Sequence, residues 1–85
     1  MDIALELVKL EMLDRSALLQ KVAGLRASSD RDGSFFSALM KDPRTAELCV
    51  GFSWERAGSP CWDSPDLPTS ALRSYAHALI ARATA

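Results

Sequence analysis

The sequence predicts a small, mainly α-helical protein that folds as a single domain over residues 1–85. Apolar residues recur at helical spacing near both ends of the chain, over residues 2–26 and 69–83. All four prolines, and three of the four glycines, lie between these two segments. A chain of 85 residues has the size of one domain, and its 48% hydrophobic content argues against intrinsic disorder.

The longest predicted element is a helix over residues 2–26, which carries two adjacent apolar stripes. The stripes consist of Ile3, Leu7 and Leu10, and of Leu5, Val8, Met12, Leu19 and Val22. Arg15 interrupts the second stripe, so a break in which Asp14 or Ser16 caps a second helix is an alternative. Because two antiparallel helices need a longer turn than this stretch offers, we expect one long or gently kinked helix. Glu11 and Arg15 would then form an i,i+4 ion pair.

Shorter elements follow this helix. Residues 27–34 are polar and predict a loop. Short helices are expected over residues 35–50, with Ser34 as the cap of the first. The pair Asp42-Pro43 predicts the start of the second, because aspartate is a favourable cap and proline is favoured at the first helical position.

The region after these helices allows two interpretations. Residues 48–54 alternate between apolar and other residues, which is typical of a half-buried strand. A short β-hairpin around residues 48–62, turning at Ala57-Gly58, is therefore an alternative to the helical interpretation. Otherwise residues 51–68, with three prolines, are expected to be an irregular loop that contains both tryptophans.

The final element is a helix over residues 69–83, with Thr69 or Ser70 as its cap. Its predicted apolar face consists of Leu72, Tyr75, Ala76, Leu79, Ile80 and Ala83. The expected architecture is thus two long terminal helices packed with one or two short helices between them.

Charge and hydropathy argue against two classes of function. The chain has 10 basic and 11 acidic residues, so no basic excess is present to neutralise a phosphate backbone, and nucleic-acid binding is not expected. No apolar run is long enough to span a bilayer, and Met1-Asp2 lacks the positive charge of a secretion signal. We therefore expect a cytoplasmic protein without a membrane segment.

No catalytic or metal site is predicted. Cys49, Cys61 and His77 lack the closely paired spacing of zinc ligands, so no metal and no cofactor is expected. The cysteines are interpreted as structural thiols. A hydrolytic triad of His77 with Ser74 and Asp66 has no supporting nucleophile motif such as GxSxG. The protein is accordingly not expected to be an enzyme.

The candidate sites are surfaces for a protein partner or for self-association. Trp54 and Trp62 are interpreted as core anchors or, with Arg56, as a binding hot spot in the proline-rich loop. The apolar face of the first helix is wide, so Leu5 and Met12 are candidates for the part that another protein covers.

One segment carries a family resemblance, the run Phe-Phe-Ser-Ala-Leu-Met-Lys-Asp-Pro-Arg-Thr-Ala-Glu-Leu at residues 35–48. It resembles helix–proline–helix segments of bacterial proteins: the leader regions of peptide natural-product precursors related to nitrile hydratase subunits, and the small subunits of some ring-cleaving dioxygenases. The resemblance covers these residues only. The chain departs from the precursors at residues 83–85, where the glycine-bounded core peptide is not recognisable.

The leading functional hypothesis is a non-catalytic protein–protein interaction module: an adaptor, an inhibitor or an accessory subunit. It would act through a helical face and the Trp54–Trp62 loop. The resemblance implies two alternatives, a precursor peptide with a helical leader for tailoring enzymes and a small accessory subunit of a larger metabolic enzyme.

Overall fold

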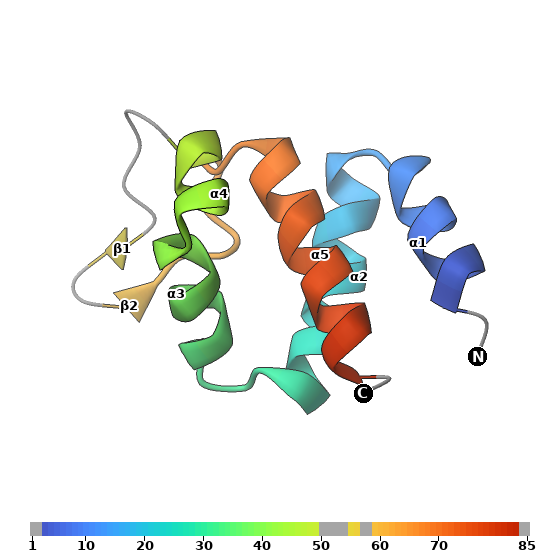
Figure 1. The fold of residues 1–85 in the computed structure, drawn as a ribbon, viewed down its shortest axis with the longest axis horizontal. Coiled ribbons are helices and arrows are strands. Elements are labelled where there is room, and N and C mark those ends of the chain that lie inside the picture. Colours follow the sequence, from blue (N-terminus) through green and yellow to red (C-terminus); the bar gives the residue numbers. More distant parts are fainter. Residues whose placement is uncertain (1–2, 50–54, 57–58, 84–85) are drawn as a thin grey trace.

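The computed structural model describes residues 3–49, 55–56 and 59–83, and its fold is mainly helical, as predicted (Figure 1). In chain order the described elements are α1 (Ile3–Glu11), α2 (Arg15–Ser29), α3 (Ser34–Lys41), α4 (Pro43–Ala46), the 3₁₀ helix η1 (Glu47–Cys49), β1 (Glu55–Arg56), β2 (Ser59–Pro60) and α5 (Thr69–Ala83).

The C-terminal helix α5 is the centre of the fold. It has the predicted bounds of residues 69–83 and packs against both α2 and α1 (Figure 1). α2 runs in the same direction as α5, and α1 runs antiparallel to α2. The α5 face that enters the core consists of Ala71, Leu72, Tyr75, Ala76, Leu79 and Ile80. Ala83, which was predicted on that face, is exposed because the core ends before the last turn.

The predicted single helix over residues 2–26 is wrong, because the chain breaks into α1 and α2 at Met12–Asp14. Asp14 has an extended backbone, and its Oδ1 accepts a hydrogen bond of 2.9 Å from the Ala17 amide, which caps α2. Arg15 turns away from Glu11 and donates to the carbonyl oxygens of Ser64 and Leu67, at 2.8 and 2.6 Å. The expected Glu11–Arg15 ion pair is therefore replaced by contacts to distant parts of the chain.

The predicted loop over residues 27–34 is shorter than expected, because α2 extends to Ser29 and α3 begins at Ser34. Ser34 is not the cap of α3: Gly33 occupies that position with a φ of 75°, in the left-handed region that glycine tolerates best. The capping side chain is Asp30, whose carboxylate accepts from the amides of Phe35 and Phe36 at 3.0 Å each.

The short helices predicted over residues 35–50 are present as α3, α4 and η1. α4 begins as Asp42-Pro43 predicts, and Asp42 Oδ1 accepts from the Arg44 amide at 2.9 Å. Helical backbone continues through Cys49, so a strand does not begin at residue 48, and residues 50–54 lie outside the described residues.

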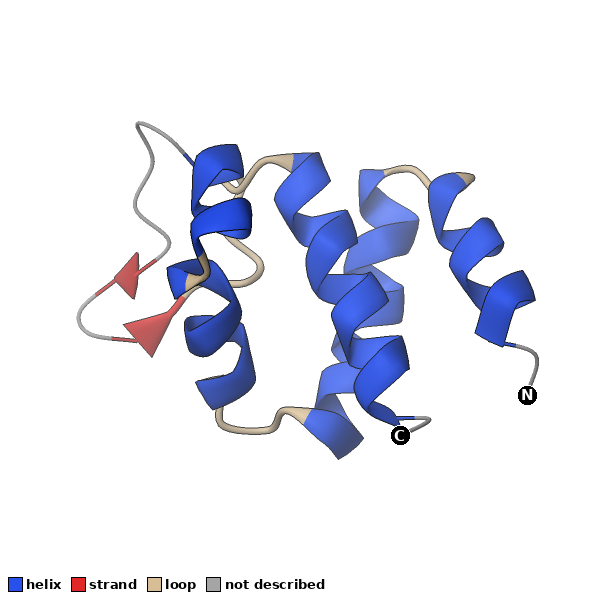
Figure 2. Ribbon diagram, viewed as in Figure 1, coloured by secondary structure: helices blue, strands red, loops and turns tan. Residues whose placement is uncertain are grey.

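The hairpin alternative applies only to a short segment. β1 and β2 pair antiparallel, with Glu55 opposite Pro60 and Arg56 opposite Ser59, and they lie at the left edge of the fold (Figure 2). The rest of the connection, from residue 61 to residue 68, is irregular as predicted. Within this segment Leu67 is buried, two residues before α5 begins.

The hydrophobic core lies between α5, α2 and α3. Phe36 and Tyr75 form its aromatic centre, with ring centroids 4.8 Å apart in an edge-to-face arrangement. The other fully buried members contributed by elements outside α5 are Leu10, Leu18, Val22, Met40 and Leu67. Of α1, only Leu10 is fully buried, so this helix lies at the margin of the core.

Candidate functional site

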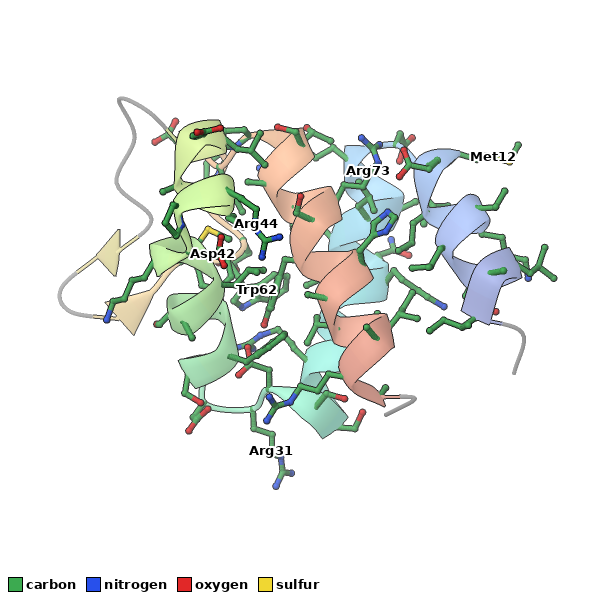
Figure 3. All side chains as sticks on the ribbon, in the orientation of Figure 1. Met12, Arg31, Asp42, Arg44, Trp62 and Arg73 are labelled. Atoms are coloured by element: carbon green, nitrogen blue, oxygen red, sulfur yellow. The ribbon has the colours of Figure 1, made fainter. Side chains whose placement is uncertain are left out.

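The most distinctive surface of the protein is the side of α1 that points away from α5. Leu5, Val8 and Met12 are 50%, 58% and 82% exposed, and we call these three residues the outer face of α1. Leu5 and Val8 lie in α1 and Met12 directly follows it, and their spacing of three or four positions puts the side chains on one side. Figure 3 shows Met12 pointing away from the rest of the molecule.

The periodicity of α1 explains why it has apolar residues on two sides. Leu7 and Leu10 take the side that faces α5 and the core. The outer face is rotated away from them, where the described chain provides no covering helix. Among the large apolar side chains exposed in the described residues, all but Leu48 belong to α1 or to the residue that follows it. Exposed apolar side chains gathered on one element are typical of a contact surface.

A groove of about 740 Å³ lies between α1 and α5, and none of the three outer-face residues lines it. Small and polar residues of α5 form one wall, and residues of α1 form the other. Its lining consists of Leu7, Glu11, Ser70, Arg73, Ser74, His77, Ala78 and Ala81.

The polar groups of the groove hold α1 against α5. His77 Nε2 lies 2.8 Å from Glu11 Oε1. The Arg73 guanidinium donates to the carbonyl oxygens of Leu10 and Leu13, at 3.3 and 3.0 Å, at the end of α1. Carbonyl groups at a helix C-terminus have no partner within the helix, so a basic side chain at this position satisfies them.

The groove does not assemble the hydrolytic triad considered from the sequence. The carboxylate beside His77 is Glu11 and not Asp66. Ser74 lines the same groove, but no hydrogen bond joins its hydroxyl to His77 among the described residues. A serine nucleophile needs a base within hydrogen-bond reach, so this arrangement provides no activated nucleophile.

Trp62 lies in a different part of the molecule from the outer face of α1. It is half-buried and packs against the core, with the Arg26 guanidinium carbon 4.9 Å from the centre of its ring (Figure 3). Trp54 lies outside the described residues, and of Arg56 only the backbone in β1 is described. The described structure therefore brings Leu5 and Met12 together and does not bring Trp62 to them.

A buried polar contact between Asp30 and Tyr75 was not predicted from the sequence. Asp30 is 4% exposed and accepts a hydrogen bond from the Tyr75 hydroxyl, besides the two amides that begin α3. Burial, followed by the hydrogen bond to Asp30, raises the pKa of Tyr75. The hydroxyl therefore stays protonated and ties α5 to the start of α3. A tyrosine within the apolar face of a predicted helix was the available signal, because a buried hydroxyl requires a partner.

The remaining candidate residues are the two cysteines. Cys61 is a free, half-buried thiol, and the side chain of Cys49 is not described. Over residues 3–49, 55–56 and 59–83, no group of three or more histidine, cysteine or acidic residues is arranged to hold a metal ion. None of the helices in the described part of the chain is both long and apolar enough to cross a lipid bilayer.

Comparison with known protein families, with curated proteins and with solved structures gives no significant match to this chain. The resemblance of residues 35–48 to precursor leaders and dioxygenase small subunits therefore rests on those residues alone. In the structure they form α3, α4 and the start of η1, which is the helix–proline–helix arrangement that the resemblance implies.

Proposed function

We propose that this protein is a non-catalytic protein–protein interaction module, and that the outer face of α1 is its contact surface. The observation that carries the proposal is the concentration of exposed apolar side chains at Leu5 and Val8 in α1 and at Met12, which directly follows it. Exposed apolar residues scattered singly need no explanation, whereas a group on one side of an element is typical of a binding surface.

The partner that fits this surface is a polypeptide with an amphipathic helix. Leu5, Val8 and Met12 follow one another at helical spacing, which is the arrangement that an apolar stripe on a partner helix would cover. We propose that the contact forms in the cytoplasm, where Cys49 and Cys61 would stay reduced.

Affinity capture from the native lysate tests the proposal when wild-type bait is compared with a Val8→Asp variant. Val8 is 58% exposed, so the aspartate is solvated in the free protein and should change its stability by less than about 0.5 kcal/mol. In a complex the same carboxylate would be buried against apolar groups, and binding should be lost. Leu48→Asp is the matched control, because Leu48 is also exposed, at 39%, but lies in η1.

The proposal predicts a polypeptide that wild type and Leu48→Asp retain in stoichiometric amount and that Val8→Asp loses. Equal capture by all three baits, or capture of nothing, would contradict it. Intact-mass measurement of the bait separates the precursor alternative, which predicts a chain of altered mass. The accessory-subunit alternative predicts that the retained polypeptide is a much larger metabolic enzyme.

A further inference from the structure

We propose that α1 is a hinged arm, which is latched to α5 by Arg73 and opens independently of a body formed by α2–α5. The inference concerns the motion of α1 and goes beyond the proposed function, on which it does not depend. It rests on how the chain around Met12–Asp14 distributes its hydrogen bonds and on how little of α1 is buried.

The body is held together without α1. Asp14 caps α2 through the Ala17 amide, so the start of α2 does not need α1 in front of it. Arg15 fastens the start of α2 to the segment before α5, through the carbonyl oxygens of Ser64 and Leu67.

At the other end of the body, Arg82 donates to the Ser29 carbonyl at 3.1 Å, where α2 ends. Tyr75 joins Asp30 in the interior. Each of these contacts stays intact when α1 leaves.

The attachment of α1, in contrast, consists of a few contacts at its margins. Leu10 is its only fully buried residue, and Leu7 is half-buried. The polar attachments are the Arg73 bonds to the last carbonyls, the Glu11–His77 contact, and a 3.5 Å ion pair of Glu6 with Lys21. The two side-chain pairs are partly or largely exposed, so water screens them. Elements with few buried apolar contacts open at lower free energy than the core.

Opening would change what α1 presents to its surroundings. In the docked state α1 exposes its outer face, and Leu7 and Leu10 are turned toward α5. In the open state both apolar sides of α1 are accessible, and so is the α5 surface that carries Arg73 and His77. The arm thus has two states that differ in the apolar surface they offer, and a ligand that prefers one state shifts the population toward it.

Native-state hydrogen exchange of the full chain, read residue by residue by NMR, tests the arm. The amides of residues 7–11 report on α1, because the first four amides of a helix have no partner within it. The amides of Tyr75 to Ile80 report on the body. The inference predicts that in the wild type the α1 amides have the larger opening equilibrium constant. It also predicts that their exchange depends only weakly on denaturant, because opening exposes little surface.

Two arginine variants on the same helix separate the arm from the body. Arg73→Met removes the bond to the Leu10 carbonyl of α1, which exists only when α1 is docked, so exchange in α1 should rise roughly tenfold, as expected for the loss of a charged hydrogen bond. Arg82→Met removes the equivalent cap at the end of α2, which the open state retains. It should speed exchange in the body and leave the α1 amides unchanged.

Two results would overturn the inference. One is equal opening constants for the α1 and α5 amides in the wild type. The other is faster exchange of the α1 and α5 amides by the same factor in Arg82→Met. Either result would show that α1 opens only when the whole domain unfolds. If Arg73→Met does not fold, Glu11→Gln weakens the other polar contact between α1 and α5, which Glu11 makes with His77. It should raise α1 exchange by a smaller factor, and an unchanged rate would count against the attachment of α1 by polar contacts.

Discussion

The buried contact between Tyr75 and Asp30 provides the sharpest test of how the fold is held together. Tyr75→Phe removes one hydroxyl and keeps the ring, so the edge-to-face contact with Phe36 at 4.8 Å is preserved. The Asp30 carboxylate, 4% exposed, then keeps the amides of Phe35 and Phe36 but loses its only side-chain donor among the described residues.

The expected loss follows from the burial of this carboxylate. A hydrogen bond to a charged group contributes about 1.5–3 kcal/mol, and water has little access to replace the lost donor. We therefore expect Tyr75→Phe to lower the free energy of unfolding by about 2 kcal/mol. For a domain of this size, that corresponds to a fall in Tm of roughly 8–16 °C.

Urea and thermal unfolding at pH 7, followed by circular dichroism, measure this change. Ser28→Ala is the control, because its hydroxyl makes an exposed 3.3 Å bond to the Leu25 carbonyl, and its loss should change stability by less than about 0.5 kcal/mol. If Tyr75→Phe were as stable as Ser28→Ala, the account of Asp30 as a buried junction between α3 and α5 would be refuted.

Three further predictions concern caps and connections. Arg15→Met, which removes the tie between α2 and the segment before α5, should cost about 2 kcal/mol in urea unfolding. Gly33→Ala should lower the free energy of unfolding by about 1–2 kcal/mol, because residue 33 has a φ of 75°. Gly24→Ala should raise it by about 0.5–1 kcal/mol, because nothing lies within 4 Å of the added carbon. Thermal unfolding of the two variants checks that the changes have opposite signs. The pKa of Asp32 is lowered from 3.8 by the Ser34 amide, and that of Asp42 is lowered from 3.8 by the Arg44 side chain. Because both carboxylates have a lower pKa in the folded than in the unfolded chain, their contribution to stability is complete above pH 3.8. It is lost as the pH falls through the lower folded-state values. Acid titration of the unfolding free energy should show this loss, and it should be shallower in Asp42→Asn.

The C-terminal helix α5 and the short helices α3 and α4 could be predicted from the sequence, because local signals and tertiary packing favour the same structure there. The apolar face of α5 and the Asp42-Pro43 cap each specify their element with residues that lie close together in the chain. The sequence offered the break between α1 and α2 only as an alternative to one long helix, although the Asp14 cap is a local signal for it. The side chains of Arg15 and Arg73 stabilise the break through hydrogen-bond partners that lie 49 to 63 residues away in the sequence.

The candidate site was predictable only in part. The spacing of apolar residues predicted a wide helix face that either the C-terminal helix or another protein covers, and the structure exposes Leu5 and Met12. The sequence did not decide whether that face or the tryptophan loop is the candidate contact surface, because the answer depends on which residues the tertiary packing buries. Trp62 packs against the core beside Arg26, so the surface that remains apolar and exposed among the described residues is on α1.

Site-specific photo-cross-linking in the native cell tests the central claim, that the outer face of α1 contacts another polypeptide. A photoreactive amino acid is placed at position 8 in one variant and at position 48 in another, since both side chains are exposed in the free protein. The account predicts a discrete cross-linked product from position 8 that is missing from position 48. No product from position 8, or the same product from both positions, would contradict it.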